Sequence, residues 1–346
     1  MPTLMLLGNC VAQRLEGLLR ATAGPAVVGG AEGALKAAGH GWRVLRSTPV
    51  HQAATGPDPE GALAALAAQA EACDLVFSQP LFNYGPCNTA ELAPRLGDRL
   101  RLMAAPNFEA YFPDVLALGP PAEPERVARP FDWHSRILVL CKAAGTPPEE
   151  AAALYLAHPL FRERAVADAL TRTWATYARR EQGLHVGTLA VARQWYGREP
   201  LFYTWNHPAE RLMAVMLDGI LKELGMGEAA RGADLLRVGW TGGPPHAPPA
   251  DSPAPLDAAP GKREGWTGSA ANPEPPAPPW SFGFNRWPII TRHHRLFAFP
   301  GRENFRVAGA EIDLSSMALA WYNWYDLHPQ TFRAALMAAT QKEGGR

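Results

Sequence analysis

The residues best placed for chemistry lie at the start of the chain. A short apolar run, Thr3-Leu4-Met5-Leu6-Leu7, is followed by Gly8-Asn9-Cys10 and then by apolar residues at helical spacing. Such a run predicts a strand buried on both faces, and asparagine is a preferred N-terminal cap of a helix. A thiol in the first turn of a helix lies at the positive end of the helix dipole and ionises more easily than a free thiol. The pattern predicts that Cys10 is a nucleophile or that the turn binds an anion; the alternative is that Cys10 is a small buried apolar side chain.

A nucleophilic thiol needs a base, and two histidines are candidates. His207 ends an aromatic run at Asn206-His207-Pro208, directly before a long predicted helix. A histidine at such a junction can be fixed by its neighbours, as general-base catalysis requires, or it can simply cap the helix. His134 and Ser135 lie at the predicted start of another helix, where the pair can bind an anion or cap the helix.

Two further polar residues complete the candidate catalytic set. Gln79 follows a predicted strand, and its neutral amide can hold an oxyanion without adding a charge. Asp114 follows Pro113 and can orient an imidazole as the third member of a triad. Each has a plainer alternative, because Gln79 can cap a loop and Asp114 can begin a turn.

The first 110 residues alternate predicted strands and helices. The predicted strands cover residues 3–7, 42–45, 74–80 and 100–105. The predicted helices lie after residue 10, at 59–73 and from 89, with a weakly helical stretch at 29–41. This alternation predicts a parallel sheet with helices on both faces. Because right-handed crossovers bring the carboxyl ends of the strands to one edge, the segments 8–10, 78–80 and 106–108 should meet there.

The rest of the chain departs from this pattern. Residues 126–240 contain amphipathic helical segments, and residues 241–280 repeat proline, as in Pro-Glu-Pro-Pro-Ala-Pro-Pro. A segment of that composition cannot bury a core and is predicted to be flexible. We expect an α/β part that carries the nucleophile (1–125), a helical part completing the same catalytic domain (126–240), a flexible insertion (241–280) and an irregular C-terminal segment that packs back on the core (281–346).

Composition narrows the class of protein. The 346 residues include 33 Lys plus Arg and 33 Asp plus Glu, so no net charge attracts nucleic acid or an anionic membrane. The four cysteines show no spacing typical of a zinc site or a disulfide framework, so we expect no metal and a reducing compartment. The sequence shows neither a signal peptide nor a run of about 18 apolar residues. We therefore expect a cytoplasmic protein without a transmembrane segment.

Several motifs occur in an order that resembles one family. They are Gly8-Asn9-Cys10, Ser78-Gln79-Pro80, residues 108–114, Trp133-His134-Ser135, Phe202 to Pro208 and Trp287-Pro288-Ile289-Ile290. Their order resembles the WcbI polysaccharide-biosynthesis acetyltransferase family over residues 3–225 and part of the tail. The chain departs from the family pattern at Val11, where glutamine is usual, and at Phe112, where histidine is usual.

The resemblance implies an SGNH/flavodoxin-like α/β fold, binding of coenzyme A or acetyl-CoA as a substrate, and O-acetylation of a sugar in a capsule or similar glycan. On this interpretation Cys10 is the nucleophile or contacts the thioester, and His207 is the base, with His134 as second choice. Gln79 and the Cys10 amide would hold the oxyanion, and Asp114 would support catalysis. The remaining candidates would contact coenzyme A: Asn9, Arg14, His134, Ser135 and Asn206.

Two other functions are compatible with the same residues. An SGNH-like esterase or deacetylase would use water as the acceptor. A non-catalytic CoA- or glycan-binding protein would retain the site without turnover, and the departures at Val11 and Phe112 favour it. The sequence predicts neither the acceptor sugar, nor the acyl group, nor the oligomeric state.

Overall fold

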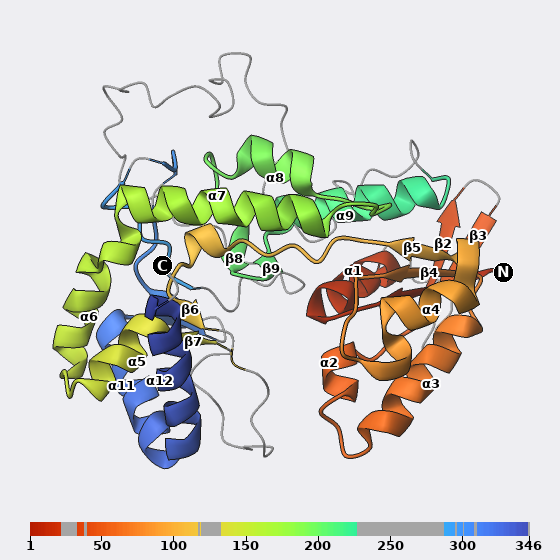
Figure 1. Cartoon of the computed structure of the whole chain (residues 1–346). Helices are drawn as coiled ribbons and strands as arrows, with labels where there is room; N and C mark the ends of the chain where they lie inside the picture. The colour runs from red at the N-terminus through yellow and green to blue at the C-terminus, as the bar shows by residue number, and fades with distance from the viewer. Residues whose placement is uncertain are drawn as a thin grey trace. The chain divides into compact units, whose positions relative to one another are not determined.

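The computed structural model describes residues 1–21, 33–37, 40–116, 118, 133–226, 287–294, 296–299, 301–307 and 310–344. These residues form two units, each assembled from segments distant in sequence (Figure 1). Unit 1 comprises Met1–Pro106, Tyr177–Trp195 and the described part of Pro208–Ser281. Unit 2 comprises Asn107–Thr176, Tyr196–His207 and the described part of Phe282–Arg346. The expected insertion at 241–280 lies outside the described residues.

Unit 1 is built on a five-stranded sheet with the order β2-β3-β1-β4-β5. The strands are β1 (Thr3–Leu7), β2 (Gly33–Ala37), β3 (His40–Val44), β4 (Leu75–Ser78) and β5 (Leu100–Leu102). Strands β3, β1, β4 and β5 are parallel, and β2 pairs antiparallel with β3 at the edge. The predicted α/β class with an N-terminal parallel sheet is thus confirmed.

The two faces of this sheet are covered by different helices. Met5 and Leu7 of β1 pack with Leu63 and Leu66 of α3 (Pro59–Glu71) in one buried cluster. The β1-to-β3 and β3-to-β4 connections run in opposite directions across the sheet, so right-handed crossovers place α1 (Cys10–Ala21) and α3 on opposite faces. Further helices of unit 1 are α2 (Val50–Ala53), α4 (Thr89–Leu96), α8 (Leu189–Trp195) and α9 (Glu210–Glu223).

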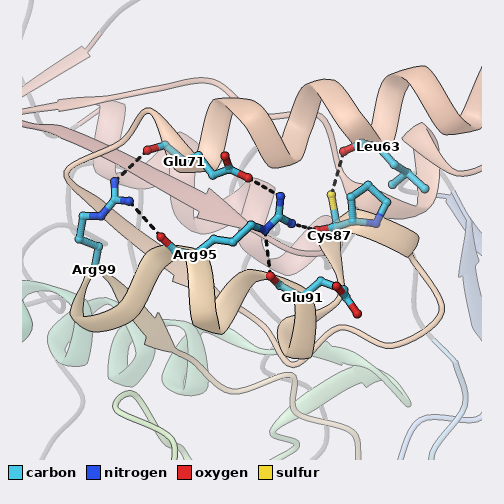
Figure 2. Close-up of polar contacts among 7 residues, drawn as sticks. Leu63, Glu71, Cys87, Glu91, Arg95 and Arg99 are labelled. Carbon is cyan, nitrogen blue, oxygen red and sulfur yellow. Dashed lines mark hydrogen bonds and ion pairs between the residues drawn. The ribbon is translucent and has the colours of Figure 1, made fainter.

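Two arginines fasten α4 and the turn after it to the end of α3 (Figure 2). The Arg99 guanidinium donates to the carbonyl oxygens of Glu71 (2.8 Å) and Cys73 (2.7 Å), where α3 has just ended. Glu71 is the last residue of α3, and its carbonyl is one that a helix end leaves without an intrahelical partner. A cation there also complements the helix dipole. Arg95 forms an ion pair with the Glu71 carboxylate and donates to the carbonyl oxygens of Glu91 and Pro86.

Unit 2 is mostly helical. Its helices α5 (Arg136–Ala143), α6 (Pro148–Ala157), α11 (Leu314–Leu327) and α12 (Pro329–Gly344) pack together. Helix α7 (Glu163–Arg180) begins in unit 2 and ends in unit 1. Short strand pairs are β6 (Val115–Leu116) with β7 (His134–Ser135), β8 (Phe202–Thr204) with β9 (His207–Pro208), and β10 (Phe305–Val307) with β11 (Ala310–Ile312). Single 3₁₀ turns lie at η1 (Gly85–Cys87), η2 (Gly97–Arg99), η3 (Glu109–Tyr111) and η4 (Pro159–Phe161).

Three local predictions were wrong. Residues 33–37 form the edge strand β2 instead of a weak helix, because they pair along β3. His134 lies on β7, paired with Leu116, and the helix begins only at Arg136. The helix that the sequence pattern predicts from Gly183 to Trp195 begins only at Leu189, where α8 starts, since Val186 before it bridges to Met103 beside β5. Within the described residues, no helix combines the length and apolar character needed to cross a bilayer.

Arg99→Ala should lower the free energy of unfolding by about 1–2 kcal/mol, because two carbonyls at the end of α3 lose charge-assisted donors. Glu71→Gln is the matched control. It breaks only the partly exposed ion pair with Arg95 and should cost less than about 1 kcal/mol. Urea unfolding of both variants measures the difference, and an equal cost would contradict the assignment.

Candidate functional site

The Gly8-Asn9-Cys10 turn lies at the carboxyl end of β1 and starts α1. The side-chain oxygen of Asn9 accepts a hydrogen bond from the Val11 amide at 2.8 Å, so Asn9 caps the helix as predicted. Cys10 is partly exposed, whereas Cys73, Cys87 and Cys141 are buried. Burial raises the pKa of Cys87 to about 11, and it also raises the pKa values of Cys73 and Cys141. Cys10 is therefore the thiol best suited to react.

Gln79 holds this turn in place from the neighbouring strand. Its side-chain oxygen accepts from the Asn9 amide at 2.8 Å, and its side-chain nitrogen donates to the Ala104 carbonyl at 3.2 Å. The side chain is 1% exposed. A Cβ atom on Gly8 would lie only 2.3 Å from the Gln79 oxygen, so this approach requires glycine. Gln79 thus joins the ends of β1, β4 and β5; its role toward an oxyanion stays a prediction.

The turn also lies at the topological switch point of the sheet. Across the sheet the four parallel strands lie in the order β3, β1, β4, β5. The chain moves in one direction from β1 to β3 and in the opposite direction from β3 to β4, so the switch point lies between β1 and β4. Open α/β sheets of this order bind ligands outside the carboxyl ends of the strands at that point. Asn9 and Cys10 follow β1, and Gln79 follows β4, so these residues occupy the expected ligand position.

The segment after β3 adds a histidine that the sequence reasoning missed. Residues 45–50 follow β1 to its end: the Leu45 amide donates to Leu4 (2.8 Å), the Ser47 hydroxyl to Leu6 (2.7 Å) and the Val50 amide to Gly8 (2.9 Å). His51 comes next and is partly exposed, in the same unit as Cys10. Residues that follow parallel strands gather at one edge of a sheet. The same rule applied to the predicted strand at 42–45 would have identified His51.

Arg14 is the remaining unit 1 candidate. It lies on α1 four residues after Cys10, a spacing that places both on the same side of the helix, and it is partly exposed. A guanidinium at this place suits a phosphate group, since the first turn of the helix already presents backbone N–H groups and the positive end of its dipole.

In unit 2, His207 and Asn206 belong to the β8–β9 hairpin. His207 is buried, and its ring lies 5.1 Å from the Trp133 ring at 70°. Trp133 also meets Trp205 edge-on at 6.4 Å, and the Phe108 amide donates to the Trp205 carbonyl at 2.7 Å. His207 lies directly before a long helix, as predicted, since α9 begins at Glu210. The junction itself forms a short hairpin turn, with His207 against an indole ring.

Asp114 is the centre of a buried network in unit 2. Its carboxylate accepts from the Ser135 hydroxyl at 2.8 Å and from the Trp287 indole N–H at 3.3 Å, and the Tyr155 hydroxyl is bonded to it as well. Burial raises its pKa above the usual value despite these donors. The Ser135 hydroxyl in turn accepts from the Leu138 amide and caps α5. These partners are hydroxyl and indole groups, so the idea that Asp114 orients an imidazole gains no support from them.

His134 is enclosed by the aromatic residues of α11. Its side-chain Nδ1 lies 2.7 Å from the Tyr325 hydroxyl, and its ring stacks on Tyr325 at 5.7 Å and contacts Trp321 at 4.7 Å. His134 is 2% exposed and Ser135 is 1% exposed. Both therefore offer little surface to a ligand. Among the residues that the structure describes, no group of three or more His, Cys, Asp or Glu is arranged to hold a metal ion.

Asp114→Asn tests the buried network. Because burial raises the native pKa of Asp114, the native state binds this proton more tightly than the unfolded chain does. The carboxyl thus favours the native state most at low pH, and this advantage is lost as the pH rises through the native pKa. We expect Asp114→Asn to cost about 1–3 kcal/mol, with a larger cost near pH 4 than at pH 7. Urea unfolding across this range measures it, and a cost that grows with pH would contradict the assigned direction.

Comparisons with known proteins agree on one family. The sequence profile of the family described as polysaccharide biosynthesis enzyme WcbI matches residues 3–229. A solved structure described as WcbI, a polysaccharide biosynthesis enzyme, in native form without a disulfide bond between CoA and a cysteine, is similar with a TM-score of 0.57. The two sequences are 13% identical, and the match covers 98% of this chain and 99% of that one, so it shows the fold alone. A search of curated proteins gave no significant match. Because the profile covers well over half of the 346 residues, the chain belongs to the WcbI family of polysaccharide biosynthesis enzymes.

Proposed function

We propose that this chain is an acetyl-CoA-dependent O-acetyltransferase that modifies a sugar hydroxyl during polysaccharide biosynthesis. The observation that carries the proposal is the partly exposed thiol of Cys10 at the start of α1, at the switch point of a parallel sheet. The similar solved structure, which is described as a native form without a disulfide bond between CoA and a cysteine, links this fold to CoA and supports the proposal. The absence of disulfide-type cysteine spacing supports a cytoplasmic location.

The residues around Cys10 fit a CoA thioester. The first turn of α1 would attract the phosphates, and Arg14 would pair with one of them. Asn9 and Gln79 keep the turn in one conformation, so the thiol and its backbone amide are preorganised. Asn206, which is partly exposed, remains a candidate contact. We assign His134 and Ser135 to the unit 2 core because both are buried.

The proposed reaction transfers the acetyl group from the sulfur of CoA to an oxygen of the acceptor. In one route Cys10 attacks the donor carbonyl and becomes an acetyl thioester, its thiol proton passes to the departing CoA sulfur, and Cys10 is the thiolate that departs when the acceptor reacts. In the other route Cys10 only contacts the donor thioester, and CoA is the thiolate that departs. His207 removes the proton of the acceptor hydroxyl as the new C–O bond forms, and the proton ends on the departing thiolate. The Cys10 amide holds the oxyanion of the tetrahedral intermediate. The partly exposed rings of Trp133 and Trp205 would contact the apolar face of a sugar.

Oxidation with CoA disulfide tests the donor side. The wild-type protein should gain one CoA by mass spectrometry, and the adduct should be lost in Cys10→Ser. Cys141→Ala is the matched control and should keep the adduct, because burial raises the pKa of that thiol. Reduced CoA should raise the melting temperature of both the wild-type protein and Cys10→Ser if binding precedes chemistry. Labelling of Cys141 in place of Cys10 would refute the site.

Acetyl transfer to a panel of sugar acceptors tests the assigned base. His207→Gln should lower kcat by about 100-fold or more, as expected for a lost general base. His51→Gln is the comparison, and its effect should stay below about 10-fold. The opposite ranking would transfer the role to His51. Release of acetate with no acceptor dependence would show the esterase function instead, and CoA binding without turnover would show a binding protein.

A further inference from the structure

A late segment of unit 2 is bonded to the strand that leads into His207. Residues 287–302 lie far along the chain from β8 and beyond residue 229, where the family profile ends. The Trp287 amide donates to the Tyr203 carbonyl at 2.9 Å. Arg302 donates from Nε to the Trp287 carbonyl at 2.8 Å, and from Nη2 to the carbonyls of Phe202 (3.1 Å) and Tyr203 (2.9 Å). One guanidinium therefore joins the late segment to two of the three residues of β8.

The late segment is itself held firmly around Arg302. The backbones of Ile289 and Arg302 exchange two hydrogen bonds, at 2.8 and 3.0 Å. A Cβ atom on Gly301 would lie 2.3 Å from the Ile289 carbonyl oxygen, so the close approach of the two strands requires glycine. The Gly301 amide also donates to the Thr291 hydroxyl at 2.9 Å. The backbone of Arg302 is thus already fixed, so the side chain loses little conformational entropy when its guanidinium binds β8.

The other end of the segment is anchored in the core. Trp287 is fully buried, and its indole N–H is bonded to the Asp114 carboxylate and to the Tyr155 hydroxyl, at 3.3 and 3.2 Å. Its backbone at the same time binds Tyr203 and Arg302. Trp287 therefore binds both Asp114 and β8. Through Trp287, Asp114 can affect the position of the hairpin without a direct contact to an imidazole.

These bonds fix the part of the hairpin that His207 continues. Only Trp205 and Asn206 separate β8 from His207, and the Trp205 carbonyl is held by the Phe108 amide. We propose that Arg302 is a positioning residue, which sets the place of His207 by binding the carbonyls of β8. The proposal rests on the role of His207 in the proposed function. Lysine cannot replace Arg302, because an ammonium lacks the planar fork that reaches several carbonyls at once.

Arg302→Lys and Arg302→Ala test the proposal, with Arg292→Ala as the control. Arg292 lies in the same segment, but it is exposed and pairs with Glu303. For acetyl transfer, both Arg302 variants should lose about 10- to 100-fold in kcat, as misplacement of a catalytic group does, while KM for acetyl-CoA changes less than about twofold. Arg292→Ala should match the wild type. Guanidine added at millimolar concentration should partly restore kcat in Arg302→Ala, which a merely unstable variant would not show.

A second readout does not depend on the acetyltransferase activity. The imidazole of His207 is titrated by NMR in the wild type and in each variant. A shifted titration midpoint in folded Arg302→Lys, with no shift in Arg292→Ala, supports the positioning role even if the wild type transfers no acetyl group. If Arg302→Ala does not fold, the kcat and the His207 titration of Arg302→Lys alone test the proposal. An unchanged His207 titration together with unchanged kcat in a folded Arg302 variant would overturn the inference.

Discussion

The side-chain amide of Gln79 is the contact on which the geometry of the unit 1 candidate site depends. Its oxygen and nitrogen bind the backbone after β1 and after β5, while its own backbone continues β4. A buried amide that loses one partner costs about 1–3 kcal/mol, so Gln79 favours the arrangement in which both of its hydrogen bonds form. The amide reaches the turn because Gly8 has no Cβ atom. Gly8, the Asn9 cap and Gln79 thus fix the backbone turn that carries the Cys10 thiol.

Much of unit 1 was predictable because its signals are local. The apolar run at β1, the Asn9 cap and the Pro59 start of α3 each follow from a few neighbouring residues. The partners of Gln79 were not predictable, because they depend on which strands become neighbours, and 70 residues separate it from Asn9. His51 was within reach of the same reasoning, since it needs only the rule that residues after parallel strands gather at one edge.

In unit 2 the sequence was less informative, for a physical reason. His134 had the signature of a helix start, but Ser135 supplies the cap, and a pairing with Leu116 makes His134 part of a strand. Asp114 was predicted to orient an imidazole as the third member of a triad, because it follows Pro113 at the end of a strand-like segment. Its burial depends on Ser135, Tyr155 and Trp287, which come from three distant segments. No local sequence pattern predicts such a network, because its polar and aromatic members come from separate segments of the chain.

The C-terminal residues show why a family profile and a functional unit need not end together. The profile stops at residue 229, yet β8 has carbonyls bonded to Trp287 and Arg302. A short strand with so few residues gains little stability from its own pairing, since nucleating local structure costs more than one or two hydrogen bonds return. The bonds from the late segment compensate for this by adding charge-assisted donors. A chain cut at the end of the profile would therefore retain the residues of the hairpin while losing the groups that hold β8 in place.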